Sequence, residues 1–314
     1  MLGPQEMPRG ADATLRQSTV WLEIAEKGSV LGVRIVLLFC TLFGRAGARL
    51  VLCPIALYYA VVHGAIRTTS RSYLTRVLGR PARFADVYRH VLCFARVLLD
   101  RLFILAGHDD LFEVTYTGDE HLRRLCDSKR GALLLSAHIG SRSAMALGKH
   151  ASALRINVIG YGANAQMINQ VLARFDRRRS VRMVELEPGS PASVLAIKSL
   201  IADGQMVAMT ADRTGLNERS MRVPFFGDDA AFATGPFVLA SLLDCPVYLV
   251  LALYRGGNRY DLFCEPLVET LRVSRAEREQ AIRECVERYA KRLEHYCRLA
   301  PDNWFNFYDF WSVR

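Results

Sequence analysis

The sequence contains no C-x-x-C pair, although eight cysteines are spread along its 314 residues. Structural zinc sites and dithiol redox motifs both depend on such close spacing, so neither is expected here. The cysteines are better explained as reduced, mostly buried residues of a protein that faces the cytosol.

The sequence also lacks a secretory signal and an apolar run long enough to cross a bilayer. Its first twenty residues mix charged residues with proline and glycine, so the N-terminus is expected to stay in the cytoplasm. The longest apolar runs, Ile35–Phe43 and Leu50–Val62, have nine and thirteen residues. A spanning helix needs about 20.

These two runs are typical of a helical hairpin that dips into one leaflet of a membrane. Arginines lie between the runs and after the second one, where they would meet lipid headgroups: Arg45, Arg49, Arg67, Arg71 and Arg76. Residues 1–110 are therefore expected to form a helical, membrane-associating region of monotopic type. A pair of helices buried in the protein is the alternative interpretation.

The formal net charge of +10 favours acidic partners, such as anionic lipid, a phosphorylated substrate or an acidic carrier protein. Nucleic-acid binding is not expected, because the chain has no zinc-finger spacing, no RNP-like segment and no basic repeat. An arginine cluster after a predicted helix is a candidate docking surface for a carrier protein or for phospholipid headgroups: Arg174, Arg177, Arg178, Arg179 and Arg182. A solvated helix end explains this cluster equally well.

Strand and helix patterns alternate after residue 111. Short apolar segments predict strands at Ala132–Ala137, Ile156–Ile159, Val181–Leu186, Met206–Ala211 and Val247–Leu253. Helical segments lie between them at Arg142–Ala153, Met167–Phe175, Pro191–Ala202 and Thr234–Leu243. The alternation predicts an α/β domain over residues 111–314, with a mainly parallel sheet and helices on both faces.

Two longer helices are expected outside this alternating pattern. Phe84–Phe103 has apolar residues at near-helical spacing and leads into the α/β domain. The final helix is expected to start at Ser274, with Glu277 completing a capping box. Its apolar face is formed by Ile282, Val286, Tyr289, Leu293 and Tyr296.

Polar residues follow two of the predicted strands. His138 comes directly after one apolar strand, and Asp212 and Arg213 come directly after another. Open parallel sheets bind their ligands at the carboxyl ends of their strands, so these side chains are expected at one sheet edge. The alternatives are a structural histidine and a loop ion pair worth about 0–1 kcal/mol.

A third segment combines arginine with aromatic residues. Arg222 precedes Phe225, Phe226 and Gly227 in the stretch RVPFFG. An exposed phenylalanine pair beside an arginine suits an amphipathic ligand. These four residues, together with Arg142, are therefore expected to contact the substrate.

Several stretches of the chain resemble the late acyltransferases of lipid A biosynthesis, within the lysophospholipid acyltransferase superfamily. The stretches are TADR, VPFFG, ATGPFVLASLLDCPVYLV, YRGGNRYDL and RLAPDNWFNFYDFW. They look like the bacterial branch associated with aryl polyene or pigment-type gene clusters. The resemblance covers nearly the whole chain.

The resemblance implies transfer of a fatty acyl group from an acyl carrier protein, or from a CoA thioester, to a hydroxyl or amine of a lipid-like acceptor. The reaction would take place at the cytoplasmic face of the bacterial inner membrane, without a metal, a cofactor or a covalent acyl-enzyme. In that scheme His138 is the general base, since imidazole has an ordinary pKa near neutrality. Backbone amides or arginines would stabilise the oxyanion.

The sequence departs from this family pattern beside His138. The pattern is a histidine, four residues and a carboxylate, and this chain has Ser143 at the last position. Loss of the comparable aspartate in a serine protease costs roughly 10⁴ in rate. Three explanations are open: Asp212 takes the role of the carboxylate, the enzyme works with a weaker base, or the chain is a catalytically silent relative that binds lipid or acts as a scaffold.

Overall fold

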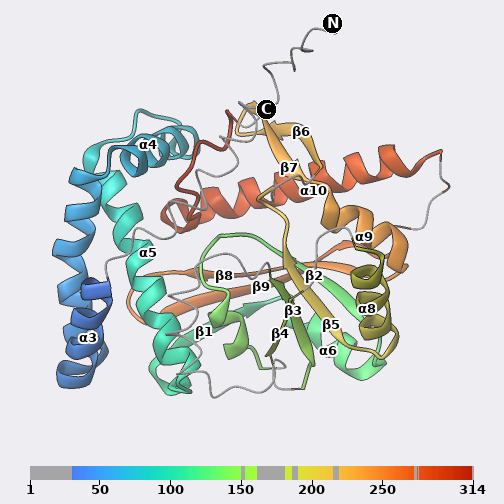
Figure 1. The fold of residues 1–314 in the computed structure, drawn as a ribbon, viewed down its shortest axis with the longest axis horizontal. Helices are drawn as coiled ribbons and strands as arrows, with labels where there is room; N and C mark the ends of the chain where they lie inside the picture. Colours follow the sequence, from blue (N-terminus) through green and yellow to red (C-terminus); the bar gives the residue numbers. More distant parts are fainter. Residues whose placement is uncertain are drawn as a thin grey trace, which may run out of the picture.

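A computed structural model of the protein describes residues 30–149, 153–160, 181–185, 190–214, 219–271, 274 and 276–312. A central β-sheet lies beside a group of N-terminal helices, and the long helix near the C-terminus crosses above the sheet in Figure 1. The arrangement is α/β, as the alternating pattern predicts.

The central sheet has seven strands in the order β1-β9-β8-β2-β5-β3-β4. Their bounds are β1 Glu113–Thr117, β2 Ala132–Ser136, β3 Ile156–Gly160, β4 Val181–Glu185, β5 Met206–Thr210, β8 Val247–Tyr254 and β9 Arg259–Val268. From β8 to β4 all neighbours are parallel, whereas β9 runs antiparallel to β8 and parallel to β1. The predicted mainly parallel sheet is confirmed, and each predicted strand is present.

Side chains of β2 alternate between two apolar layers, because successive residues of a strand point to opposite faces. Leu133 and Leu135 join a core cluster with Tyr289 of α10 (Arg278–Leu299). Leu134 joins a second cluster with Leu125 of α6 (Asp119–Ser128). Two further helices, α8 (Pro191–Ala202) and α9 (Gly235–Leu243), contribute to the first layer.

Two predicted helices differ from the observed structure. Instead of a helix over Arg142–Ala153, the structure has the short 3-10 helix η2 (Ser143–Leu147), because Gly148 leaves the helical conformation at ψ 140°. The helix predicted to start at Ser274 begins at Arg278 as α10. Ser274 and Glu277 do bond to each other, but Glu277 is the N-cap residue of α10 and Ser274 lies three residues before it. The predicted apolar face of α10 is confirmed as buried. The predicted helix Met167–Phe175 lies outside the described residues.

A two-stranded antiparallel hairpin packs against α10. It consists of β6 (Ser220–Phe225) and β7 (Asp228–Ala233). The loop residues Phe226 and Gly227 both have positive φ, at 55° and 84°, as two-residue hairpin turns of this kind require. The aromatic segment RVPFFG is thus half of a β-hairpin.

The N-terminal region consists of three described helices, α3 (Val30–Val62), α4 (Gly64–Leu78) and α5 (Phe84–Leu105). The predicted helix Phe84–Phe103 is confirmed as α5. Gly44 interrupts α3 with a non-helical conformation (φ 63°, ψ −164°), and helix continues after it. The segment Leu42–Val62, which includes Gly44, is 21 residues long with a mean hydropathy of 1.4, enough to cross a membrane by length and composition alone. The separate apolar runs of the sequence understate this length.

Arginines between the two apolar runs attach α3 to the rest of the protein. Arg45 makes a two-bonded ion pair with the fully buried Asp100 of α5, at 2.7 and 3.0 Å. Tyr260 of β9 also donates to Asp100. Arg49 donates to Gly257 O and to the Tyr254 hydroxyl. Both guanidinium groups thus bond within the protein, and their contact with lipid headgroups stays a prediction.

We expect Arg45→Ala to lower the free energy of unfolding by about 3 kcal/mol, because it leaves the buried charge of Asp100 without its ion-pair partner. Arg283→Ala is the control: its pair with Glu287 spans 4.0 Å between side chains that are 43% and 47% exposed. The control should change the free energy by less than about 0.5 kcal/mol. Denaturant unfolding in detergent measures both variants, and equal small losses would contradict the structural role of Arg45.

Candidate active site

His138 and Asp212 meet because β2 and β5 are paired neighbours. Ser136, the last residue of β2, lies opposite Thr210, the last residue of β5. His138 and Asp212 each follow two positions after these strand ends. The strand ends therefore deliver both side chains to the same point at the carboxyl edge of the sheet. The predicted juxtaposition is confirmed.

The Asp212 carboxylate holds the histidine through both of its oxygens. Oδ1 accepts the hydrogen bond of His138 Nδ1 at 2.8 Å, and Oδ2 accepts the His138 backbone N–H at 2.9 Å. Oδ2 also accepts the Trp304 indole N–H at 3.0 Å. Because a carboxylate accepts and does not donate, His138 carries its proton on Nδ1 and presents the lone pair of Nε2. That is the form a general base needs.

Electrostatic effects keep His138 neutral and Asp212 ionised, as a general base and its carboxylate partner require. Burial, and then the Arg213 charge, lower the pKa of His138 to about 4, while Asp212 acts in the opposite direction. Burial works against ionisation of Asp212, but the contacts with His138 and Arg213 hold the pKa of the carboxyl at about 2. At neutral pH the imidazole is thus neutral and the aspartate charged. The His138 side chain is 22% exposed, so the ring is reachable.

Two arginines accompany the pair. Arg213 directly follows Asp212 and donates from Nη2 to Phe305 O at 2.8 Å. Its Nε is buried and has no hydrogen-bond partner within the part of the chain that the structure describes. Arg142 is exposed, and its charge also contributes to the lowered pKa of His138. Both cations are therefore electrostatically coupled to the imidazole.

Most backbone N–H groups around His138 already donate hydrogen bonds within the protein. The His138 N–H goes to Asp212, Gly140 N donates to Asn303 O, and Ser141 N donates to Ala252 O. Gly140 has a positive φ of 58°, and a Cβ there would meet Ala252 O at 1.9 Å, so only glycine fits this close approach. The arginines are consequently the better candidates for binding developing negative charge.

Ser143 lies at the start of η2 and is partly buried. The contact on His138 Nδ1 is made by Asp212. Of the three explanations for the missing carboxylate, the geometry favours the one in which Asp212 takes its role.

The two phenylalanines of the RVPFFG segment are less exposed than predicted. Phe225 is fully buried and Phe226 is 9% exposed, where an exposed pair was expected. The reason is packing: Phe225 contacts the rings of Trp304, Phe310 and Trp311. The phenylalanine pair therefore belongs to the protein core.

Other predicted binding residues lie apart from these contacts. Arg222 is on the exposed side of β6 and bonds Asp229 O, while Gly227 occupies the hairpin turn. Arg174, Arg177, Arg178 and Arg179 lie outside the described residues. Arg182 is exposed on β4.

The C-terminal segment is the part of the site that the residue patterns did not assign. Phe305 N donates to His138 O at 2.8 Å, next to the contact of Trp304 with Asp212. The stretch RLAPDNWFNFYDFW carried the family resemblance, but no pattern within it indicates a role beside the histidine. Within the described residues, no group of three or more His, Cys, Asp or Glu side chains is placed to hold a metal ion.

An α/β sheet with a His–Asp pair at its carboxyl edge, beside arginines, defines a class of protein suited to base-catalysed group transfer. The family model for the bacterial lipid A biosynthesis acyltransferases matches residues 29–312. The chain therefore belongs to that family, which supports lipid acyl transfer in general. A search of the curated proteins found no match.

We expect Asp212→Asn to lower acyl-transfer kcat roughly 10³-fold to 10⁴-fold. In this variant, the atom at the position of Oδ2 must still accept the N–H groups of the His138 backbone and the Trp304 indole. The side-chain oxygen of the asparagine therefore occupies that position, and its NH₂ group faces His138 Nδ1. The imidazole proton then moves to Nε2 and blocks the base.

Ser143→Glu tests the position where the family pattern has a carboxylate. Since His138 already has a carboxylate partner, this substitution should not raise kcat. An Asp212→Asn variant with near-normal kcat, or a large gain from Ser143→Glu, would contradict the assignment.

Proposed function

We propose that the protein transfers a fatty acyl group from a thioester of acyl carrier protein, or of CoA, to a hydroxyl or amine of a lipid-like acceptor. The observation that carries the proposal is the His138–Asp212 contact of 2.8 Å at the carboxyl edge of the sheet. Family membership supports the same class of reaction.

His138 Nε2 removes the proton from the acceptor as the acceptor oxygen or nitrogen attacks the thioester carbonyl. The resulting imidazolium is stabilised by the charge of Asp212. The tetrahedral intermediate then breaks its C–S bond, and the leaving thiolate takes the proton from His138. Acyl ester or amide and free thiol are the products, and the enzyme returns to its starting state.

Arg213 and Arg142 are the proposed donors to the oxyanion that forms in this step. Preorganised cationic donors are worth more in a site from which water is largely excluded. The buried, unpartnered Nε of Arg213 among the described residues supports its assignment.

The catalytically silent alternative depended on Ser143. The carboxylate of Asp212 on the imidazole supports an active enzyme instead. Carrier or headgroup docking by Arg174, Arg177, Arg178 and Arg179 stays a prediction.

The direct test incubates purified protein with acyl carrier protein loaded with a labelled acyl chain, and in a parallel arm with labelled acyl-CoA, in the presence of extracted bacterial lipids. Wild-type protein should move label into lipid, and His138→Ala should reduce the rate at least about 10³-fold. Equal transfer by both proteins would overturn the role of His138. No transfer by the wild type from either donor would overturn the proposed function.

We also propose that the protein sits on the cytoplasmic face of the inner membrane through α3. This helix lies at the outer edge of the molecule, away from the sheet (Figure 1). Its large exposed apolar residues, which we call the α3 surface, are Leu38, Leu42, Phe43, Leu50, Leu57, Tyr58, Val61 and Val62. An apolar helix surface of this kind favours the interface of a bilayer.

Substitution of Leu50, Leu57 and Val61 by serine should weaken binding to anionic vesicles by at least about tenfold, because their side chains are 74%, 46% and 54% exposed on α3. The matched control changes three exposed leucines elsewhere, Leu195, Leu242 and Leu299. Co-sedimentation with vesicles measures both. Unchanged binding of the α3 variant would show that this surface does not contact the membrane.

A further inference from the structure

A buried serine–histidine pair joins two N-terminal helices. Ser70 of α4 and His90 of α5 are both fully buried, and Ser70 Oγ lies 2.7 Å from His90 Nδ1. The other ring nitrogen, Nε2, lies 2.9 Å from the backbone oxygen of Trp304. Neither residue belongs to any motif that the sequence suggested.

The partners fix the proton positions of His90. A carbonyl oxygen only accepts, so Nε2 carries the proton and donates to Trp304 O. Nδ1 then accepts the hydrogen of the Ser70 hydroxyl. Burial lowers the pKa of His90 to about 4, so the ring is neutral at pH 7. The rings of Tyr73, Phe305 and Phe307 surround it.

Trp304 connects this pair to the catalytic base. Its backbone oxygen accepts hydrogen bonds from His90 Nε2 and from Asn306 N, and its indole N–H donates to Asp212 Oδ2. Asp212 in turn holds His138 Nδ1. The next residue, Phe305, bonds the backbone of His138. Hydrogen bonds on both sides of Trp304, joined through that residue itself, thus connect α4 and α5 to the imidazole.

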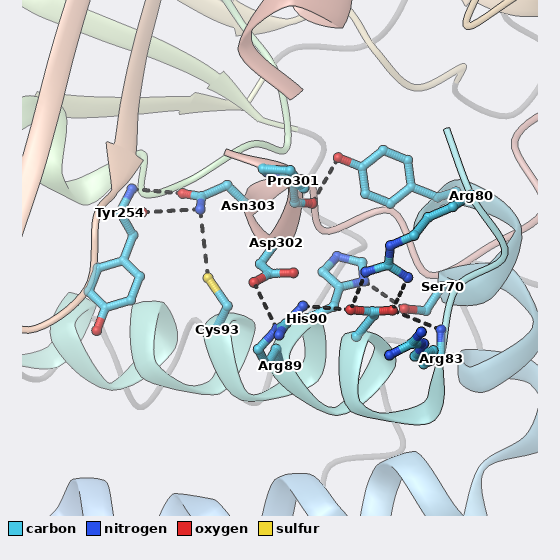
Figure 2. Close-up of polar contacts among 12 residues, drawn as sticks. Ser70, Arg80, Arg83, Arg89, His90, Cys93, Tyr254, Pro301, Asp302 and Asn303 are labelled. Carbon is cyan, nitrogen blue, oxygen red and sulfur yellow. Dashed lines mark hydrogen bonds and ion pairs between the residues drawn. The ribbon is translucent and has the colours of Figure 1, made fainter. Parts of the chain in front are cut away.

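The same C-terminal segment has other anchors that do not lead to Asp212. Figure 2 shows Pro301, Asp302 and Asn303 beside α5, with Arg89 facing Asp302 and Cys93 facing Asn303. Tyr73 of α4 donates to Pro301 O at 2.9 Å. These anchors hold the preceding residues, whereas His90 holds the residue that bonds the catalytic aspartate.

We propose that Ser70 and His90 are positioning residues for acyl transfer, which act through Trp304 to set the orientation and charge of Asp212. The inference rests on the proposed function and extends the catalytic machinery into the N-terminal helices. Without the hydrogen bond from His90, the Trp304 backbone loses a donor and the indole loosens from Asp212. A carboxylate with one donor fewer attracts the imidazolium more strongly, which raises the pKa of His138.

The main experiment compares His90→Leu with Tyr73→Phe. Each substitution removes one donor to a backbone carbonyl of the same segment and keeps an apolar group in the same place. His90→Leu should lower kcat roughly tenfold to a hundredfold with little change in KM. The acid limb of its pH–rate profile should move upward by about half a pH unit to one. Tyr73→Phe should leave both close to wild type.

Two further variants distinguish a loss of positioning from a loss of folding. His90→Gln can still offer an N–H to Trp304 O and should recover a large part of kcat. Ser70→Ala, a small change, should lower kcat in the same direction as His90→Leu but less. If His90→Leu does not fold, a Ser70→Ala variant with wild-type kcat and pH profile overturns the proposal. A His90→Leu variant that folds and behaves like Tyr73→Phe overturns it as well.

A titration that needs no turnover separates this inference from the proposed function. The His138 ring is followed by NMR with labelled histidine, and its signals are assigned by comparison with His138→Ala. The pKa of His138 should rise in His90→Leu and stay unchanged in Tyr73→Phe. A wild type that transfers no acyl group, together with this rise, would overturn the proposed function and support the coupling. An unchanged pKa in His90→Leu would overturn the coupling alone.

Discussion

The buried carboxylate of Asp212 is the interaction on which the site depends. It is fully buried and accepts three hydrogen bonds, two from His138 and one from Trp304. A buried charge is costly unless it is bonded in this way. These bonds therefore fix the histidine ring, the end of β2 and the C-terminal segment relative to one another.

The N-terminal helices are tied to the α/β sheet by polar contacts as well as by apolar packing. Arg45 and Asp100 pair where α3 meets α5, and Tyr260 of β9 joins them. Nearer the start of α5, His90 bonds the C-terminal segment. The helix α3, which carries the proposed membrane surface, is thus bonded to α5, which supports the segment around His138. Membrane attachment and catalysis would then depend on the same small group of helices.

Much of this arrangement could be predicted from local sequence. Apolar segments located β2 and β5, and the rule for parallel strands was enough to bring His138 and Asp212 together. The antiparallel strand β9 and the β6–β7 hairpin were not predicted, because their partners are set by pairing and turn geometry. For the same reason, Phe225 looked like a surface residue although it packs on Trp304.

The contributions of His90 and Trp304 could not be predicted either. His90 and Trp304 are separated by 214 positions in the chain, and no spacing rule connects residues that far apart. A buried histidine in an amphipathic helix gives no signal of its own, since such residues are usually structural. Only the folded contacts distinguish a histidine that bonds the catalytic segment from one that fills the core.

The central claim is that Asp212 holds the proton of His138 on Nδ1 and leaves Nε2 free as the base. Nitrogen NMR of the protein with ¹⁵N-labelled histidine measures this directly, because protonated and unprotonated ring nitrogens have distinct shifts and couplings. At neutral pH we expect a neutral His138 with its proton on Nδ1. A proton on Nε2, or a charged ring at that pH, would contradict the proposed role of Asp212.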